Sequence, residues 1–186
     1  MRVVLAEDEP IIRMDIKRML EEIGCRVLGE CRDGATAIEL VKKYHPDIVL
    51  MDIKMPGTNG LAATRMISGE MLAPVVLLTS YSDPRTIEKA MASGALGYLV
   101  KPVEKKKLKP AFEVARQRFL EMRKLRTDIK GLSAAVADRS LIAQTKSMLQ
   151  KKTGCSEEEA YRMLRRTSMN QQRKISEVAK DFLLTN

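Results

Sequence analysis

The fold of this chain is decided by one stretch, Asp47-Ile48-Val49-Leu50-Met51-Asp52-Ile53-Lys54-Met55-Pro56-Gly57. Ile48 to Met51 is an unbroken apolar run, which is typical of a strand buried on both faces of a parallel sheet. The run ends in a carboxylate at Asp52, and Met-Pro-Gly then predicts a loop. Ligands bind at the carboxyl ends of the strands in open α/β sheets. A single acid here could be a plain turn residue, so its meaning depends on the other strand ends.

Strands and helices are predicted to alternate through the first hundred residues. The other apolar segments expected to be strands lie at 2–6, 25–29, 74–78 and 98–100. Apolar residues at helical spacing follow the first four strands, in helices expected near 11–23, 34–44, 60–71 and 83–93. Such alternation predicts right-handed crossovers and an α/β fold with a five-stranded parallel, doubly wound sheet. His45, the single histidine, ends a helix before Pro46 and is interpreted as structural.

Polar residues follow four of the predicted strands and would gather at one edge of the sheet. They are Glu7 and Asp8, then Asp52, Thr79 and Lys101. Three carboxylates in one place repel one another unless a cation neutralises them, and an all-oxygen set suits Mg²⁺. A hydroxyl and an ammonium at the same edge suit an incoming phosphoryl group, with Asp52 as its acceptor.

Residues 1 to about 120 resemble the receiver domain of two-component response regulators. The resemblance covers the acidic pair Glu7-Asp8, Asp52 with Met55-Pro56-Gly57, Thr79 and Lys101-Pro102, with Glu7 standing where Asp is commoner. It implies a flavodoxin-like fold and phosphoryl transfer from a histidine kinase to Asp52, with no enzymatic activity beyond slow autodephosphorylation. It also implies switch roles for Thr79, Lys101 and Tyr98, and Mg²⁺ held by Glu7, Asp8, Asp52 and the backbone carbonyl of Lys54.

Length and amino-acid composition limit the number of domains and the kind of protein that this chain can be. The chain has 186 residues, 45% hydrophobic and 4% aromatic, enough for one full domain and a small second one with an aliphatic core. Three cysteines without a Cys-x-x-Cys spacing (Cys25, Cys31 and Cys155) predict neither a disulfide framework nor a zinc site. The apolar N-terminal stretch is too short for a signal peptide, and no stretch is long enough to span a membrane. We therefore expect a cytoplasmic protein without a membrane partner.

Charge is unevenly divided along the chain. Residues 1–100 hold 12 Lys+Arg and 14 Asp+Glu, whereas residues 101–186 hold 21 and 10. A basic second half suggests a polyanionic partner, although a solvated helical surface is a common alternative.

A long helix over 108–137, continuous with the last helix of the receiver, is predicted to be a coiled coil. Apolar residues recur in it at alternating steps of four and three residues. Two positions of this repeat are polar, Arg126 and Ser133, and each has a leucine directly before it, Leu125 and Leu132. Because 112–136 is too long to pack on its own sheet alone, we expect a homodimer on phosphorylation. Gly131 marks a weak point in the helix. The predicted dimer contacts are Phe112, Phe119, Met122, Ile129 and Val136.

The last part, 138–186, is predicted to be a domain of three short helices. It resembles the ANTAR domain, an RNA-binding antiterminator module, in the segments 141–149, 154–161, 164–166 and 175–179, with Thr145 and Ser147 where the family often has Ala and Gly. A capping box is expected at Ser156 and Glu159, and 170–173 is expected to be a connector. The resemblance implies binding to paired hairpins in a nascent leader transcript.

Basic and aromatic residues of the tail are the candidate RNA contacts. Tyr161 can stack on unpaired bases, and the cations that can neutralise phosphates are Lys146, Arg165, Arg166 and Arg173. Each of these residues could equally belong to a solvated helix face or a half-buried core. Two other functions are open: a DNA-binding regulator, against which we expect no tight turn between the last two helices, and a dimerising scaffold without nucleic-acid output.

Overall fold

The computed structural model describes residues 1–80 and 84–184. The chain divides into two compact units, Met1–Lys124 and Leu125–Asn186. Asp83, the residue predicted to begin a helix with Pro84, lies outside the described residues.

The first unit is built on a five-stranded sheet in the order β2-β1-β3-β4-β5, and all neighbouring strands are parallel. This confirms the predicted fold class. β3 stands at the centre, and every one of its residues is buried, as its unbroken apolar run predicts. The strands are β1 (Arg2–Ala6), β2 (Arg26–Cys31), β3 (Ile48–Asp52), β4 (Val75–Thr79) and β5 (Gly97–Val100).

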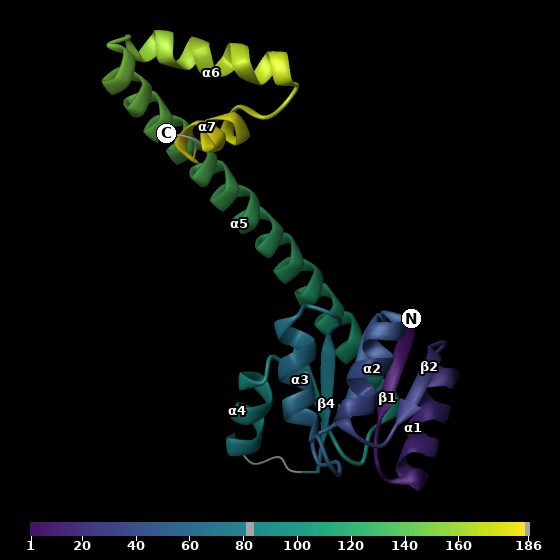
Figure 1. Cartoon of the computed structure of the whole chain (residues 1–186). Helices are drawn as coiled ribbons and strands as arrows, with labels where there is room; N and C mark the ends of the chain where they lie inside the picture. The colour runs from purple at the N-terminus through teal and green to yellow at the C-terminus, as the bar shows by residue number, and fades with distance from the viewer. Residues whose placement is uncertain (81–83, 185–186) are drawn as a thin grey trace. The chain divides into compact units, whose positions relative to one another are not determined.

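Helices cover both faces of this sheet (Figure 1). Alternate strand residues point to opposite faces, so Val4 and Ala6 pack with α2 and α3 on one face. Val3 and Leu5 pack on the other face with α1 and with α5 (Lys105–Thr153). Asp33 and Asn59 cap α2 and α3 by accepting hydrogen bonds from backbone N–H groups. The helices are α1 (Pro10–Glu22), α2 (Gly34–Tyr44), α3 (Gly60–Gly69) and α4 (Pro84–Ala92).

The start of α3 lies tightly against the end of β3. The N–H of Gly60 donates to the carbonyl of Ile53, and a Cβ on Gly60 would lie 1.9 Å from the carbonyl oxygen of Asp52. Only glycine fits there, so this contact fixes the backbone that carries Asp52.

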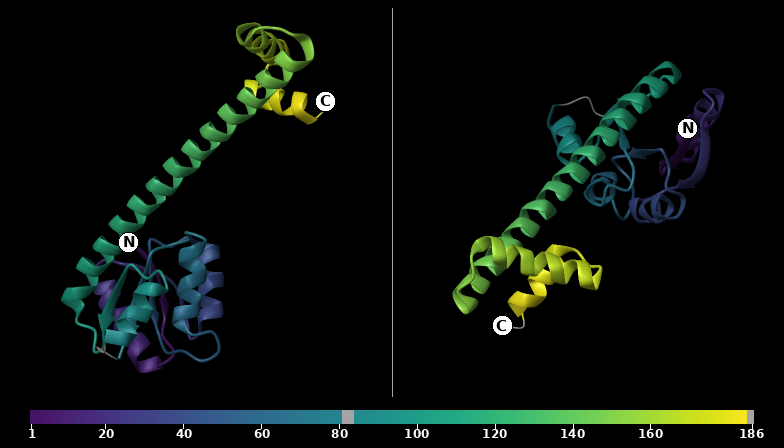
Figure 2. Two further views of the ribbon diagram at one scale, coloured as in Figure 1. Left: turned by 90° about the vertical axis from the view of Figure 1, so that its left-hand side faces the viewer. Right: turned by 90° about the horizontal axis from the view of Figure 1, so that it is seen from above.

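The helix after β5 is a single element, α5 (Lys105–Thr153), which Figure 2 shows as a continuous coil. The predicted weak point at Gly131 does not interrupt it, and the helix predicted to begin near 138 is its last part. The conformational cost of one glycine, about 1 kcal/mol relative to alanine, is therefore not enough to end this helix.

The second unit packs α6 (Glu157–Gln171) and α7 (Ile175–Leu184) against the end of α5. Its buried cluster is small, formed by Leu149, Ala160, Leu164 and Val178. The predicted capping box at Ser156 and Glu159 is confirmed. The predicted connector begins too early, because Asn170 and Gln171 still belong to α6.

Thr145, which departs from the family's usual Ala, is fully buried. Its hydroxyl lies 2.8 Å from the carbonyl of Leu141 and 3.0 Å from that of Ala179 on α7. The extra hydroxyl therefore satisfies a carbonyl between α5 and α7 rather than obstructing their packing. Within the described residues, no helix is both long and apolar enough to cross a membrane.

Candidate functional site

The polar residues expected at the sheet edge are brought together by the parallel strands. Asp52 and Thr79 are the last residues of β3 and β4, and Lys101 follows β5. The ammonium of Lys101 lies 2.8 Å from Asp52 Oδ2 and 2.7 Å from Glu7 Oε2. One cation therefore bridges two acids that reach it from different strands.

Burial sets the electrostatics of this cluster. Glu7 is fully buried; desolvation first, and then the charge of Asp52, raise its pKa above the ordinary value although Lys101 opposes the shift. Burial by itself would lower the pKa of Lys101, but its bonds to Asp52 and Glu7 raise it overall. Lys101 thus stays charged, and the site holds more negative charge than this one cation offsets.

The acids also fit a hard metal ion. One carboxylate oxygen from each of Glu7, Asp8 and Asp52 lies within 4.8 Å of the other two. Glu7 Oε2 lies 2.7 Å from the ammonium of Lys101 and accepts no other hydrogen bond among the described residues, so a second lone pair remains for a metal ion. Carboxylate oxygens with room for water are the donor set that Mg²⁺ prefers.

An opening lies beside the acids. A cavity of about 490 Å³ is lined by Asp8, Lys54, Pro56 and Asn59 with neighbouring residues. The backbone N–H of Lys54 lies 3.4 Å from Asp52 Oδ1 and is directed to donate to it. Whether the Lys54 carbonyl binds a metal stays a prediction.

The two predicted switch residues differ in exposure. Thr79 is buried at the end of β4, beside the acids. Tyr98 is 39% exposed and borders a groove of about 350 Å³ with Met91, Val114 and Arg118. The ring of Tyr98 therefore has room to change its position, as a switch residue requires.

The prediction that Phe112 and Phe119 contact a partner helix is wrong. Phe112 is fully buried in the core beneath the sheet, and Phe119 is buried too, with Arg123 over its ring at 6.0 Å. Both rings stabilise their own domain. The exposed apolar stripe of α5 starts later and runs at steps of three and four through Met122, Leu125, Ile129, Leu132 and Val136. This stripe, called the seam below, contains Leu125 and Leu132 in place of the expected polar steps.

The predicted RNA contacts fall into two groups. Lys146 is paired with Glu157 at 2.6 Å, and Arg173 is paired with Asp181 at 2.7 Å and Glu177 at 3.4 Å. These two cations already have carboxylate partners. The other group is exposed on α6 and consists of Tyr161, Arg165 and Arg166.

Three features were missed from the sequence. Lys174 and Lys180 are exposed, but single lysines near a helix carry no signal in a sequence. Arg13, which contacts the acidic turn, was not singled out from the sequence. The connection between α6 and α7 is also short, residues 172–174, so the expectation of no tight turn there was wrong.

Comparisons with known proteins agree with this geometry. The family model for the response regulator receiver domain matches residues 3–113, and the model for the ANTAR domain matches residues 130–183. The transcriptional regulatory protein PdtaR of Mycobacterium tuberculosis is 40% identical over 184 residues, which cover 99% of this chain and 90% of the relative.

Solved receiver domains have the same fold. That of the putative response regulator NarL from Mycobacterium tuberculosis has a TM-score of 0.58 and 34% identity, covering 62% of this chain and 95% of that one. The receiver domain of a sensor histidine kinase from Pseudomonas aeruginosa, with a magnesium ion in its active-site cleft, has a TM-score of 0.57 and 28% identity, covering 62% and 97%. This chain therefore belongs to the response regulators that join a receiver domain to an ANTAR domain.

Proposed function

We propose that this protein is a phosphorylation-controlled transcription antiterminator that binds hairpin loops in nascent leader RNA as a dimer. The observation that carries the proposal is that one chain holds a complete cluster of acids and lysine around Asp52 and an ANTAR domain with exposed arginines on α6. The first can receive a signal and the second can deliver it to RNA.

In the proposed phosphoryl transfer, an Asp52 oxygen attacks the phosphorus of a phosphohistidine on the kinase. The P–N bond breaks as the P–O bond forms, and the histidine leaves. Lys101 neutralises charge on the transferred group, and Thr79 donates its hydroxyl to it. A Mg²⁺ ion held by Glu7, Asp8 and Asp52 would supply further positive charge for the phosphoryl oxygens. Water reaching the same site would account for slow autodephosphorylation.

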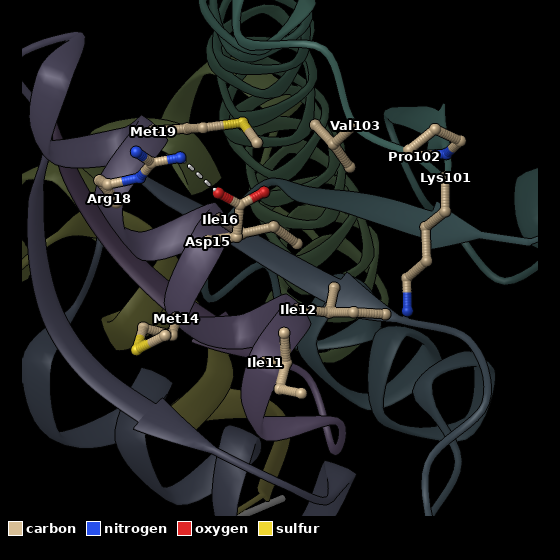
Figure 3. Close-up of a pocket in the computed structure, with 10 residues that line it drawn as sticks. All are labelled: Ile11, Ile12, Met14, Asp15, Ile16, Arg18, Met19, Lys101, Pro102 and Val103. Carbon is tan, nitrogen blue, oxygen red and sulfur yellow. Dashed lines mark hydrogen bonds and ion pairs between the residues drawn. The ribbon is translucent and has the colours of Figure 1, made fainter.

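The kinase must dock beside Asp52, and α1 offers an apolar surface there. Ile11 and Met14 are 78% and 68% exposed, more than any other large apolar residue that the structure describes in the first unit. They line a cavity of about 600 Å³ that continues to Lys101, Pro102 and Val103, as the side chains in Figure 3 show. Exposed apolar patches next to a reacting group are typical of protein interfaces.

Replacing both Ile11 and Met14 with Ser should slow transfer from the kinase by about 100-fold or more, because each large apolar side chain buried on docking contributes about 1.5–3 kcal/mol. Labelling by acetyl phosphate, which needs no docking surface, should be unchanged. Met66→Ser, an equally conservative change at an exposed methionine of α3, is the control. Equal transfer rates from the kinase to all three proteins would refute this docking face.

The charge distribution along α6 directs RNA to one end of that helix. Its first turn holds Glu157, Glu158 and Glu159, which repel phosphates, whereas Arg165 and Arg166 follow two turns later. No carboxylate pairs with these two arginines within the described part of the chain. Tyr161 lies one turn before Arg165, so it shares a face with it. Stacking on Tyr161 and phosphate contacts at the arginines together fit an unpaired loop.

Tyr161→Ala should cost about 1–3 kcal/mol of binding to the cognate loop if one base stacks there, and much less for random RNA. Arg166→Ala should instead weaken all RNAs alike and reduce the slope of affinity against salt concentration. Arg173→Ala is the matched control, since its charge is already shared with Asp181 and Glu177. The measurement is a filter-binding titration at several salt concentrations. Identical losses for Tyr161→Ala and Arg173→Ala would count against stacking.

The experiment that tests the whole function compares phosphorylated and unphosphorylated protein on three nucleic acids at matched salt. They are an RNA with two hairpins, an RNA with one, and duplex DNA. The proposal expects the phosphorylated form to prefer the two-hairpin RNA, because a dimer gains avidity from a second site. A preference for duplex DNA would support the DNA-binding alternative, and no affinity for any of them would support a scaffold.

A further inference from the structure

Arg13 on α1 is joined to the turn that carries the acidic pair. Its guanidinium nitrogen Nη1 donates to the carbonyl oxygen of Glu7 at 2.8 Å and lies 3.4 Å from that of Asp8. On the other side, its Nε lies 3.7 Å from a carboxylate oxygen of Glu30 on β2. The side chain is only 13% exposed, so these contacts are largely shielded from water.

Every polar group of Glu7 is engaged, and Oε2 lies 2.7 Å from the ammonium of Lys101. Its N–H donates to the carbonyl of Cys31, its carbonyl accepts from Arg13, and Oε1 accepts from the N–H of Glu9 at 3.3 Å. Arg13 is the side chain that holds the carbonyls of this turn.

We propose that Arg13 is a positioning residue for the metal site, holding the Glu7–Asp8 turn so that both carboxylates face the ion. The proposal rests on the Mg²⁺ site of the proposed function. Residues that orient metal ligands without touching the metal commonly change its affinity by about 10- to 100-fold. Arg13 acts here through the backbone of the ligands rather than through their side chains.

Electrostatics alone predicts the opposite change in Mg²⁺ affinity when Arg13 is replaced, so the two explanations can be told apart by experiment. Arg13 is a cation near the site, so removing its charge would by itself strengthen the binding of Mg²⁺. Positioning predicts that Arg13→Gln weakens it, because glutamine cannot hold the two carbonyls and Glu30 together. Arg13→Lys keeps the charge and one donor, so it should recover part of the affinity.

The measurement is Mg²⁺ binding to the full chain by calorimetry, together with the rate of labelling by acetyl phosphate as a function of Mg²⁺ concentration. For Arg13→Gln we expect a Kd for Mg²⁺ about tenfold higher, with the same labelling rate once Mg²⁺ is saturating. Lys17→Gln is the matched control, because Lys17 pairs with the same Glu30 at 2.6 Å without a contact to the acidic turn. Its Kd should equal that of the wild type.

The outcomes separate cleanly. An unchanged or lower Kd for Mg²⁺ in Arg13→Gln overturns the positioning role. The role is also overturned if the labelling rate at saturating Mg²⁺ falls in proportion to a loss of folded protein, which a thermal melt would show. Partial recovery of the Kd by Arg13→Lys supports the role. If the wild type binds no Mg²⁺, the metal site of the proposed function fails and this inference falls with it, whereas equal binding by wild type and Arg13→Gln overturns the inference alone.

Discussion

Asp52→Asn should abolish the phosphoryl adduct that the wild-type protein gains from acetyl phosphate and Mg²⁺. The amide that replaces the carboxylate is a poor nucleophile, and it removes one of the three acids that would hold the metal. The variant should fold as well as the wild type, because asparagine is nearly isosteric and relieves repulsion between Asp52 and Glu7. Intact-mass measurement detects the adduct, which should be lost in acid.

Asp47→Asn is the matched control for this experiment. Asp47 lies just before β3 and pairs with Arg2 at 3.1 Å, so the same chemical change is made at a nearby acid outside the cluster. Loss of an exposed pair of this kind costs about 0–1 kcal/mol, and labelling should be unchanged. A full yield of adduct in Asp52→Asn would show that another residue accepts the phosphoryl group.

The fold and the cluster of acids and lysine around Asp52 could be predicted because their signals are local. The apolar run before Asp52 indicates a buried parallel strand, and parallel strands place their carboxyl ends at one edge. Asp52, Thr79 and Lys101 therefore had to meet once the strands were recognised. Arg13 could not be recognised in this way, because its hydrogen bonds run to backbone carbonyls, which leave no trace in the sequence.

The dimer contacts and RNA contacts were harder to predict for a different reason. A helical repeat of apolar residues looks the same in the sequence whether the helix packs on its own sheet or on a partner helix. Phe112, which is buried, and Ile129, which is exposed, belong to one such repeat. Lys146 and Arg173 likewise appear in the sequence as free positive charges available to bind phosphates. Their carboxylate partners Glu157 and Asp181 are assigned only by the packing of α6 and α7 against α5.

Dimerisation through the seam can be tested by replacing Leu125 and Leu132 with Ser, which should leave the phosphorylated protein monomeric. Both side chains are exposed in the single chain, 61% and 68%, so neither chain is destabilised by losing them. In a paired helix they would be buried, and four leucines at about 1.5–3 kcal/mol each amount to about 6–12 kcal/mol. That is comparable with the whole free energy of a micromolar complex, about 8 kcal/mol.

Two further variants make this prediction specific to the seam. Lys124→Ser with Lys130→Ser changes as many exposed residues outside the seam of α5 and should leave the dimer intact. Gly131→Ala should also leave it intact, since a Cβ there meets no atom within 4 Å and the helix propensity of alanine stabilises monomer and dimer alike, because α5 is already helical in the single chain. Sedimentation with and without acetyl phosphate measures all three.

The same seam variant decides whether dimerisation is what couples phosphorylation to the choice of RNA. Leu125 and Leu132 are distant in sequence from Tyr161, Arg165 and Arg166, so affinity for a single hairpin should be unchanged in the double serine variant. The advantage of a two-hairpin transcript should disappear, because a monomer carries one ANTAR domain and gains no avidity. If the monomeric variant kept that advantage after phosphorylation, one ANTAR domain would have to read both hairpins, and the seam would have no part in selecting the RNA.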